Sequence, residues 1–238
     1  MNALNKTIVI CGVTGGVGRA LAIRFGHLKW RVIGLARNAD KLQKLSELIG
    51  DNFTYYKTDI KNEKNVATVF KAINSNFHNI DILVNSAAVF KMEKFEKCSF
   101  KDIDTLIDTN LKGLMYVTLT AIKIMKKYNE PNRIVNIGSV ASIRGIENQA
   151  IYCASKFGLN GFSEALNQEV IKDNISITTL FPGGIDTPLW SENNPYPAGS
   201  TENLLKANDI VNIIEMLSDL EPRIILKNMT IFPSNEWH

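Results

Sequence analysis

Residues 133–158 read RIVNIGSVASIRGIENQAIYCASKFG, and this stretch decides the fold class of the chain. It opens with a β-branched run around Ile134, which is typical of a buried parallel strand. A loop of small and polar residues follows, and a helical pattern begins at Tyr152. This order predicts one unit of an open α/β sheet. Ser139 then lies at the carboxyl end of the strand, where such sheets bind ligands.

Tyr152 and Lys156 are four residues apart, so on a helix their phenol and ammonium groups lie on one face. A cation beside the phenol is expected to lower the tyrosine pKa from its ordinary value of about 10. Such a tyrosine can act as an acid or base near neutral pH. Taken alone, the pair has a simpler interpretation as a surface contact. The strand-end Ser139, thirteen residues upstream, favours the catalytic interpretation.

A second strand–turn–helix unit lies near the amino end. Residues 6–11 form a β-branched strand, a glycine-rich turn follows at 12–18, and an apolar helical pattern comes next. A glycine turn lets backbone amides approach a pyrophosphate at the amino terminus of a helix. The simpler interpretation is a tight turn that binds no ligand.

These motifs together resemble the short-chain dehydrogenase/reductase family in its compact one-domain branch, and the resemblance covers essentially the whole chain. It implies hydride transfer with a nicotinamide cofactor, catalysed by Ser139, Tyr152 and Lys156. Asn110, within an Asn-x-x-Gly element, completes the set by holding a water. The glycine turn matches the family pattern Thr-Gly-x-x-x-Gly-x-Gly, except that Cys11 replaces the threonine.

The resemblance also implies which residues bind the cofactor. The second strand, at 30–35, ends in Ala36, where members that use NAD carry an aspartate, and Arg37 comes next. An arginine there pairs with the 2′-phosphate of NADP, and Lys41 adds positive charge. The simpler interpretation of Arg37 is a solvated arginine in a loop. The expected set is Gly12, Thr14, Gly15, Gly16, Val17, Gly18, Arg37, Asp59, Ile60, Asn85, Ala87, Tyr152, Lys156, Pro182, Gly183, Ile185 and Thr187.

Two positions in this set keep alternatives open. Asp59, after the strand at 53–57, contacts the adenine ring or caps the helix expected at 61–77, and both can hold. Residues 85–88 read Asn-Ser-Ala-Ala where the family has Asn-Asn-Ala-Gly. If position 88 needs a positive φ, Ala88 carries strain that glycine would avoid.

Strands and helices alternate along the whole chain, so we expect one domain over residues 1–238. The expected fold is a doubly wound, seven-stranded parallel sheet of Rossmann type in three α/β/α layers. The remaining strands are expected at 82–84, 175–181 and 229–232, and a last helix, capped by Asn208 or Asp209, is expected to run to residue 218. Residues 188–207, with Pro, Asn, Gly and Ser concentrated in 188–200, predict a substrate lid.

A long helix expected at 102–128 is apolar on most of its circumference in its second half, which indicates burial on two sides. Small residues at Ala154, Gly158, Gly161 and Ala165 form one stripe on the helix after Tyr152, and allow close approach of another backbone. Both helices therefore predict self-association to a dimer or tetramer.

Composition narrows the function classes. The net charge of +3 is spread along 238 residues with no basic block, so nucleic acid is not expected as a partner. Three scattered cysteines and three isolated histidines predict neither a disulfide framework nor a metal site, and fit the reducing cytoplasm. No apolar run reaches ~18 residues, so no membrane span is expected. The apolar start reads as a strand and not as a secretion signal.

We therefore expect an NADP-dependent oxidoreductase that acts on a carbonyl or secondary alcohol. Tyr152 transfers the proton, Ser139 binds the carbonyl oxygen, Lys156 lowers the tyrosine pKa and binds the nicotinamide ribose, and Asn110 holds a relay water. One alternative is a catalytically idle NADP-binding sensor or scaffold, which would not need these four residues. A sugar-nucleotide epimerase or dehydratase is another, but such chains usually carry a larger carboxyl-terminal region.

The substrate stays open at this point. Several apolar side chains suggest an apolar ligand, namely Phe90, Met92, Phe95, Ile143, Ile146, Leu189 and Trp190. Three cations, Lys91, Lys94 and Arg144, suggest an anionic one.

Overall fold

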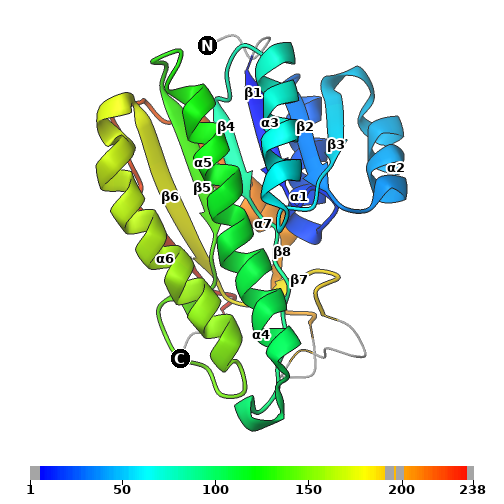
Figure 1. The fold of residues 1–238 in the computed structure, drawn as a ribbon, viewed down its shortest axis with the longest axis vertical. Coiled ribbons are helices and arrows are strands. Elements are labelled where there is room, and N and C mark those ends of the chain that lie inside the picture. The colour runs from blue at the N-terminus through cyan, green and yellow to red at the C-terminus, as the bar shows by residue number, and fades with distance from the viewer. Residues whose placement is uncertain (1–5, 191–195, 197–200, 235–238) are drawn as a thin grey trace.

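The computed structural model of the chain describes residues 6–190, 196 and 201–234. Seven parallel strands form one sheet in the order β3-β2-β1-β4-β5-β6-β9 (Figure 1). Strand β1 pairs with β2 on one side and with β4 on the other, so the sheet grows outward in both directions from β1. The doubly wound, Rossmann-type sheet predicted from the sequence is confirmed. Its strands are β1 (Thr7–Cys11), β2 (Arg31–Ala36), β3 (Phe53–Lys57), β4 (Ile82–Asn85), β5 (Asn132–Ile137), β6 (Ile175–Pro182) and β9 (Asn228–Ile231).

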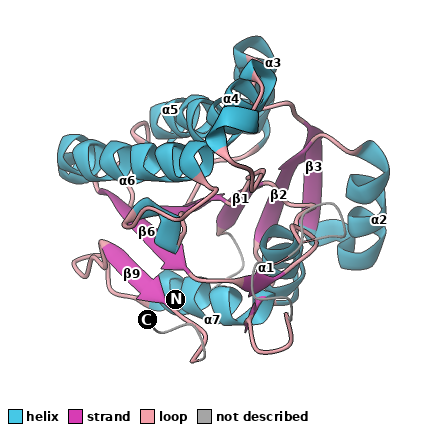
Figure 2. Ribbon diagram, turned by 90° about the horizontal axis from the view of Figure 1, so that it is seen from below, coloured by secondary structure: helices cyan, strands magenta, loops and turns pink. Residues whose placement is uncertain are grey.

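Helices cover both faces of the sheet, which gives the three layers seen in Figure 2. One face carries α1 (Gly16–His27), α2 (Ala39–Ile49) and α7 (Ala207–Asp219). The opposite face carries α3 (Glu63–Asn76), α4 (Phe100–Ile107), α5 (Gly113–Met125) and α6 (Ala150–Val170). Short 3₁₀ turns occupy Gly50–Asn52, Phe95–Lys97, Val140–Ser142 and Ile171–Asp173. Among the described helices, none combines the length and the apolar composition needed to cross a bilayer.

The central strand β1 contributes to both halves of the core because its side chains alternate between the two faces. Ile8 and Ile10 pack in the cluster with α1 and α7. Val9 and Cys11 pack in the cluster with α3, α5 and α6. Burial on both faces explains why the strand is apolar at every position instead of alternating with polar residues.

The helix predicted at 102–128 is a run of three pieces. Helix α4 passes into a π-helical turn at Asp108–Lys112, and α5 follows directly. A π-helical turn inside a helix commonly marks a functional site, and this turn contains Asn110. Burial on two sides does not extend over all of α5 within one chain, because the Leu119 side chain is 55% exposed.

Two predicted helix caps are wrong. Helix α3 is capped by Asn62, whose side-chain oxygen accepts a hydrogen bond from the backbone N–H of Asn65. The Asp59 carboxylate instead accepts from the Lys61 N–H at 3.1 Å. Helix α7 begins one residue before Asn208, after Lys206 as its N-cap, and the Asp209 carboxylate accepts from the Lys206 N–H at 2.7 Å.

The strain considered at Ala88 is not found. Among the described residues other than glycine, positive φ angles occur only at Lys29, Asn129, Asn148 and Asn174. Alanine is therefore compatible with the backbone at position 88.

The stripe of small residues on α6 is only partly explained within the chain. A Cβ at Gly158 would lie 2.8 Å from the Leu111 side chain, so close approach is required there. The other three members, Ala154, Gly161 and Ala165, are exposed.

The predicted lid lies partly outside the described residues, because 191–195 and 197–200 belong to it. At its two ends, β7 (Ile185–Asp186) and β8 (Leu205–Lys206) pair as a separate two-stranded parallel sheet. The backbone on either side of this segment is thus held together.

Candidate active site

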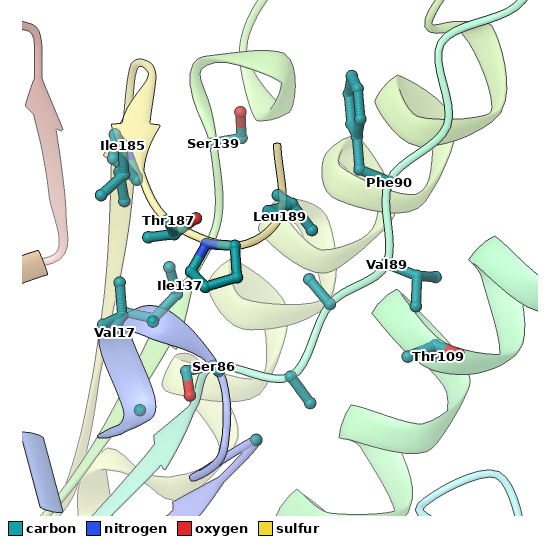
Figure 3. Close-up of a pocket in the computed structure, with 18 of the residues that line it drawn as sticks. Val17, Ser86, Val89, Phe90, Thr109, Ile137, Ser139, Ile185, Thr187 and Leu189 are labelled. Carbon is teal, nitrogen blue, oxygen red and sulfur yellow. The ribbon is translucent and has the colours of Figure 1, made fainter. Parts of the chain in front are cut away.

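A cavity of about 920 Å³ lies at the carboxyl ends of the sheet strands, where open α/β sheets bind ligands. The segments that follow β1 to β6 contribute to its lining. In Figure 3, Ser139 and Phe90 project in the same direction, and Val17 lies apart from them. Most residues predicted from the sequence meet here: Gly12, Thr14, Gly15, Gly16, Val17, Gly18, Arg37, Asp59, Ile60, Ala87, Ser139, Tyr152, Lys156, Pro182, Gly183, Ile185 and Thr187.

The glycine turn is built so that other chain segments approach its backbone closely. Gly12 has a φ of +86°, and a Cβ there would lie 2.6 Å from the Ala87 backbone. A Cβ at Gly16 would lie 2.5 Å from the Thr187 side chain. Helix α1 begins at this turn with Gly15 as its N-cap, and the described residues supply no side-chain cap. Its first N–H groups are therefore available to an anion, as a pyrophosphate requires.

Cationic side chains line the end of the cavity near β2. Arg37 follows this strand, and Lys41 lies in the first turn of α2. The Asn38 side chain caps α2 by accepting from the Lys41 N–H at 2.9 Å, which fixes the backbone between the two cations. Lys61 joins them, and the sequence analysis missed it. Its position two residues after Asp59 was the available signal. The three cations fit a phosphate group at this end.

Ser139 and Tyr152 meet at the opposite end of the cavity. Tyr152 lies in the first turn of α6 and is 8% exposed. Burial raises the pKa of the phenol to about 12, and the hydrogen bond with the Ser139 side chain opposes this rise. The expected net lowering of the phenol pKa is therefore wrong for the chain by itself: loss of hydration raises this pKa, and the group that opposes the rise is Ser139, not Lys156. The phenol keeps its proton across the neutral range.

Lys156 lies one helical turn after Tyr152, as the spacing predicted. Its Nζ donates to the Ile137 carbonyl at 2.8 Å and lies 5.7 Å from the centroid of the Tyr152 ring. The side chain is 1% exposed, and burial lowers the pKa of the ammonium from 10.5 to about 8. The cavity thus presents a lysine that is poised between its charged and neutral forms slightly above neutral pH.

Asn110 is absent from the described residues that line the cavity, but it fixes residues that do line it. Its Oδ1 accepts from the Val89 N–H at 2.8 Å, and its Nδ2 donates to the Val89 carbonyl at 2.9 Å. The same Nδ2 donates to Ser155 Oγ at 3.2 Å, and Ser155 Oγ donates to the Tyr152 carbonyl at 2.7 Å. Asn110 therefore connects the segment after β4 to the helix that carries Tyr152. The sequence analysis did not identify Ser155, because only the fold brings it to Asn110.

Asn85 is the other predicted residue that the described lining does not include. Its side chain is fully buried, and its Nδ2 donates to Thr118 Oγ1 at 2.9 Å and to Asn136 Oδ1 at 2.8 Å. Asn136 in turn donates to Ser163 Oγ at 2.8 Å. These hydrogen bonds join β4 and β5 to α5 and α6, so the Asn85 side chain has a structural role in the core.

Within residues 6–190, 196 and 201–234, the His, Cys, Asp and Glu side chains form no group that could hold a metal ion. Ser139, Tyr152 and Lys156 are polar side chains that line one end of the cavity.

Comparisons with known proteins show which proteins this chain is similar to. The chain is 32% identical over 205 residues to the 3-oxoacyl-[acyl-carrier-protein] reductase of Bos taurus, which covers 86% of this chain and 83% of that protein. It is 26% identical over 230 residues to an uncharacterized oxidoreductase of Staphylococcus aureus (strain N315), with 96% and 97% covered. Among solved structures, serine dehydrogenase from Escherichia coli aligns with a TM-score of 0.87 at 27% identity, covering 98% of this chain and 100% of that one.

A second solved structure, the closed form of serine dehydrogenase complexed with NADP⁺, aligns with a TM-score of 0.89 at 27% identity, covering 98% of this chain and 96% of that one. The family model described as short chain dehydrogenase matches residues 6–197. The fold, the placement of Ser139, Tyr152 and Lys156, and these matches lead to one conclusion: the chain belongs to the short-chain dehydrogenase family.

Proposed function

We propose that this oxidoreductase transfers a hydride between NADP(H) and a carbonyl or secondary alcohol substrate, with Tyr152 as the general acid and base. The observation that supports this most is the cavity itself. It has Ser139, Tyr152 and Lys156 at one end and Arg37 at the other, with the glycine turn between them. An extended dinucleotide has its phosphates and its reactive ring in this same order.

The residues fit a bound NADP. The uncapped amino terminus of α1 suits the pyrophosphate, and the cations Arg37, Lys41 and Lys61 suit the 2′-phosphate. Bound NADPH would supply the hydride. The NADP⁺ complex of serine dehydrogenase supports the same cofactor choice. The other lining residues predicted from the sequence would contact the remaining parts of the cofactor, with Asp59 and Ile60 beside the adenine.

In the proposed reduction, Tyr152 donates its proton to the carbonyl oxygen as the hydride reaches the carbonyl carbon. A pKa of about 12 keeps the phenol protonated beforehand, so the resting tyrosine is already the acid that reduction needs. Ser139, which hydrogen-bonds the phenol, would share the negative charge on that oxygen. Lys156 would bind the nicotinamide ribose. A relay water would bind the main chain at Asn110, since its side-chain amide is engaged by Val89 and Ser155.

The test is Tyr152→Phe, assayed with NADPH and a panel of aldehydes and ketones. The variant keeps the ring and loses only the proton donor, so NADPH binding should persist while nearly all turnover disappears. Tyr128→Phe is a matched control, because Tyr128 lies outside the cavity, with its ring 4.1 Å from that of His78. Comparable turnover in Tyr152→Phe and wild type would contradict the mechanism. Normal NADPH binding with no turnover in wild type would favour the idle sensor or scaffold.

We also propose that the protein is a homo-oligomer, a dimer or tetramer, assembled through α5 and α6. Exposed apolar side chains lie on both helices: Leu119 is 55% exposed and Phe157 is 45% exposed. The exposed small residues Ala154 and Gly161 accompany Phe157 on α6 and would let a second copy approach closely. Light scattering at micromolar concentration should give a multiple of the chain mass, and a monomer would refute this assembly.

A cytoplasmic location is also proposed. Cys11, Cys98 and Cys153 are all free thiols, as a reducing compartment would keep them.

A further inference from the structure

Four aromatic rings form a continuous wall that starts at the proposed proton donor. The Phe90 ring lies 4.8 Å from the Tyr152 ring, centroid to centroid, at an interplanar angle of 82°. Phe90 and Trp190 are 5.1 Å apart at 71°, and Trp190 and Tyr196 are 4.9 Å apart at 75°. All four side chains line the cavity. We define Phe90, Trp190 and Tyr196 as the aromatic wall.

Two members of the aromatic wall, Phe90 and Trp190, are anchored by hydrogen bonds to the backbone. Asn110 fixes the main chain of Val89, directly before Phe90, with bonds of 2.8 and 2.9 Å. The indole Nε1 of Trp190 donates to the Ile185 carbonyl at 2.8 Å, and the Trp190 N–H donates to the Thr187 carbonyl at 3.1 Å. The indole bond fixes the Trp190 ring in advance, and the Asn110 bonds fix the backbone that precedes Phe90, so less freedom remains to be lost when a ligand binds.

The structure narrows the substrate candidates that the sequence left open. Of the seven apolar candidates, Phe90, Ile146, Leu189 and Trp190 line the cavity, whereas Met92, Phe95 and Ile143 are absent from its described lining. Lys91 and Lys94 are absent from it too, and the Lys91 ammonium contacts the Asp102 carboxylate at 2.7 Å.

Arg144 does line the cavity, with its guanidinium carbon 5.5 Å from the centroid of the Phe232 ring. Apart from Arg144, the candidates that remain are apolar, and two of them are aromatic.

We propose that the aromatic wall is a substrate subsite for a planar aromatic ring, so that the substrates are aryl aldehydes and aryl ketones; this rests on the proposed function. Phe90 and Trp190 are nearly perpendicular, so a flat ring stacked on one of them meets the other edge-on. Both geometries are favoured by aromatic pairs and are unavailable to a saturated ring of the same size. Because Phe90 contacts Tyr152, a carbonyl attached to the bound ring lies next to the phenol that donates its proton.

The test compares benzaldehyde with cyclohexanecarbaldehyde, which differ in aromaticity but little in size. The two aldehydes differ in intrinsic reactivity, so the readout is the ratio of their kcat/KM values in wild type divided by the same ratio in a variant. With benzaldehyde in the numerator of each ratio, this quotient should be about 2 to about 10 for Phe90→Leu and for Trp190→Leu. Phe100→Leu is the matched control, because Phe100 is 89% exposed and lies outside the cavity; it should leave the ratio as in wild type.

An unchanged ratio in both Phe90→Leu and Trp190→Leu would overturn the subsite while leaving the proposed function intact. If no carbonyl is reduced at all, the proposed function fails instead. The subsite is then tested by the binding of two amides that are not reduced. Benzamide and cyclohexanecarboxamide keep the carbonyl but are not reduced, so calorimetric titration into NADP-saturated protein measures recognition alone. Tighter binding of benzamide in wild type that is lost in Phe90→Leu supports the wall, and equal binding of the two amides overturns it.

Discussion

The buried ammonium of Lys156 should lower the free energy of unfolding at neutral pH. Burial lowers the pKa of its ammonium from 10.5 to about 8. Each pKa unit corresponds to about 1.4 kcal/mol, so holding this group charged inside the fold costs ~3 kcal/mol. Lys156→Met removes the charge and keeps an unbranched side chain. It also leaves the Ile137 carbonyl without its 2.8 Å partner, at a cost of ~1–3 kcal/mol. The net change at neutral pH is therefore small.

The pH dependence separates these two effects. The folded pKa of Lys156 lies below the unfolded one, so between about pH 8 and about pH 10.5 the unfolded chain binds more protons, and stability rises with pH. From about pH 7 to about pH 9.5, this group alone should add ~2 kcal/mol to the free energy of unfolding of wild type. Burial raises the pKa values of Cys11 and Tyr152 to about 12, so these groups act in the opposite direction. They are common to both proteins and cancel in the comparison.

The assay is urea unfolding of protein freed of cofactor, at both pH values and at one fixed protein concentration. The free energy of unfolding of wild type should rise by ~2 kcal/mol more than that of Lys156→Met. Lys71→Met serves as control, because Lys71 is exposed on α3, and this variant should follow wild type. Parallel pH curves for wild type and Lys156→Met would refute the reasoning, since they would mean that the buried ammonium is not destabilised.

Two further predictions concern cofactor choice and the connection at Asn110. Wild type should prefer NADPH over NADH by roughly ten- to a hundredfold in kcat/KM, because a charge-assisted hydrogen bond is worth about 1.5–3 kcal/mol. Ala36→Asp with Arg37→Ile should invert or abolish that preference in cofactor titrations, and a wild type that favours NADH would disprove the assignment of Arg37. Ser155→Ala removes the hydrogen bonds that join Asn110 to the Tyr152 carbonyl, so it should lower the free energy of unfolding by ~1–3 kcal/mol and reduce kcat more than NADPH affinity. An unchanged kcat would show that these hydrogen bonds have no part in turnover.

The sheet could be predicted from the sequence because its signals are local. Most strands are short runs rich in β-branched or aromatic residues, and the glycine spacing after β1 indicates the turn. The structure gives the reason for one of these glycines: at Gly12, a φ of +86° and the nearby Ala87 backbone exclude any side chain. Tyr152 and Lys156 were predictable in the same way, because four residues on one helix fix their relative placement without any knowledge of the rest.

Long-range contacts decided what the sequence could not predict. Asn85 and Asn136 both follow apolar strand residues in the sequence, and nothing local indicates that they bond to each other across two strands. Hydrogen bonds of this kind depend on the register between β4 and β5, which pairs Asn85 with Asn136 directly. A polar residue at the end of a strand can therefore belong to the core as readily as to the site, and only the fold separates the two cases.

The proton affinity of Tyr152 shows the same limit in energetic terms. From the sequence, the visible neighbour was a cation four residues away, which favours the phenolate. Hydration of the phenolate is lost through segments distant in the sequence, among them Phe90, whose ring lies 4.8 Å away. Because burial and charge act in opposite directions, the sign of the pKa change depends on which is larger. Here burial is larger, and it keeps the Tyr152 phenol protonated across the neutral range.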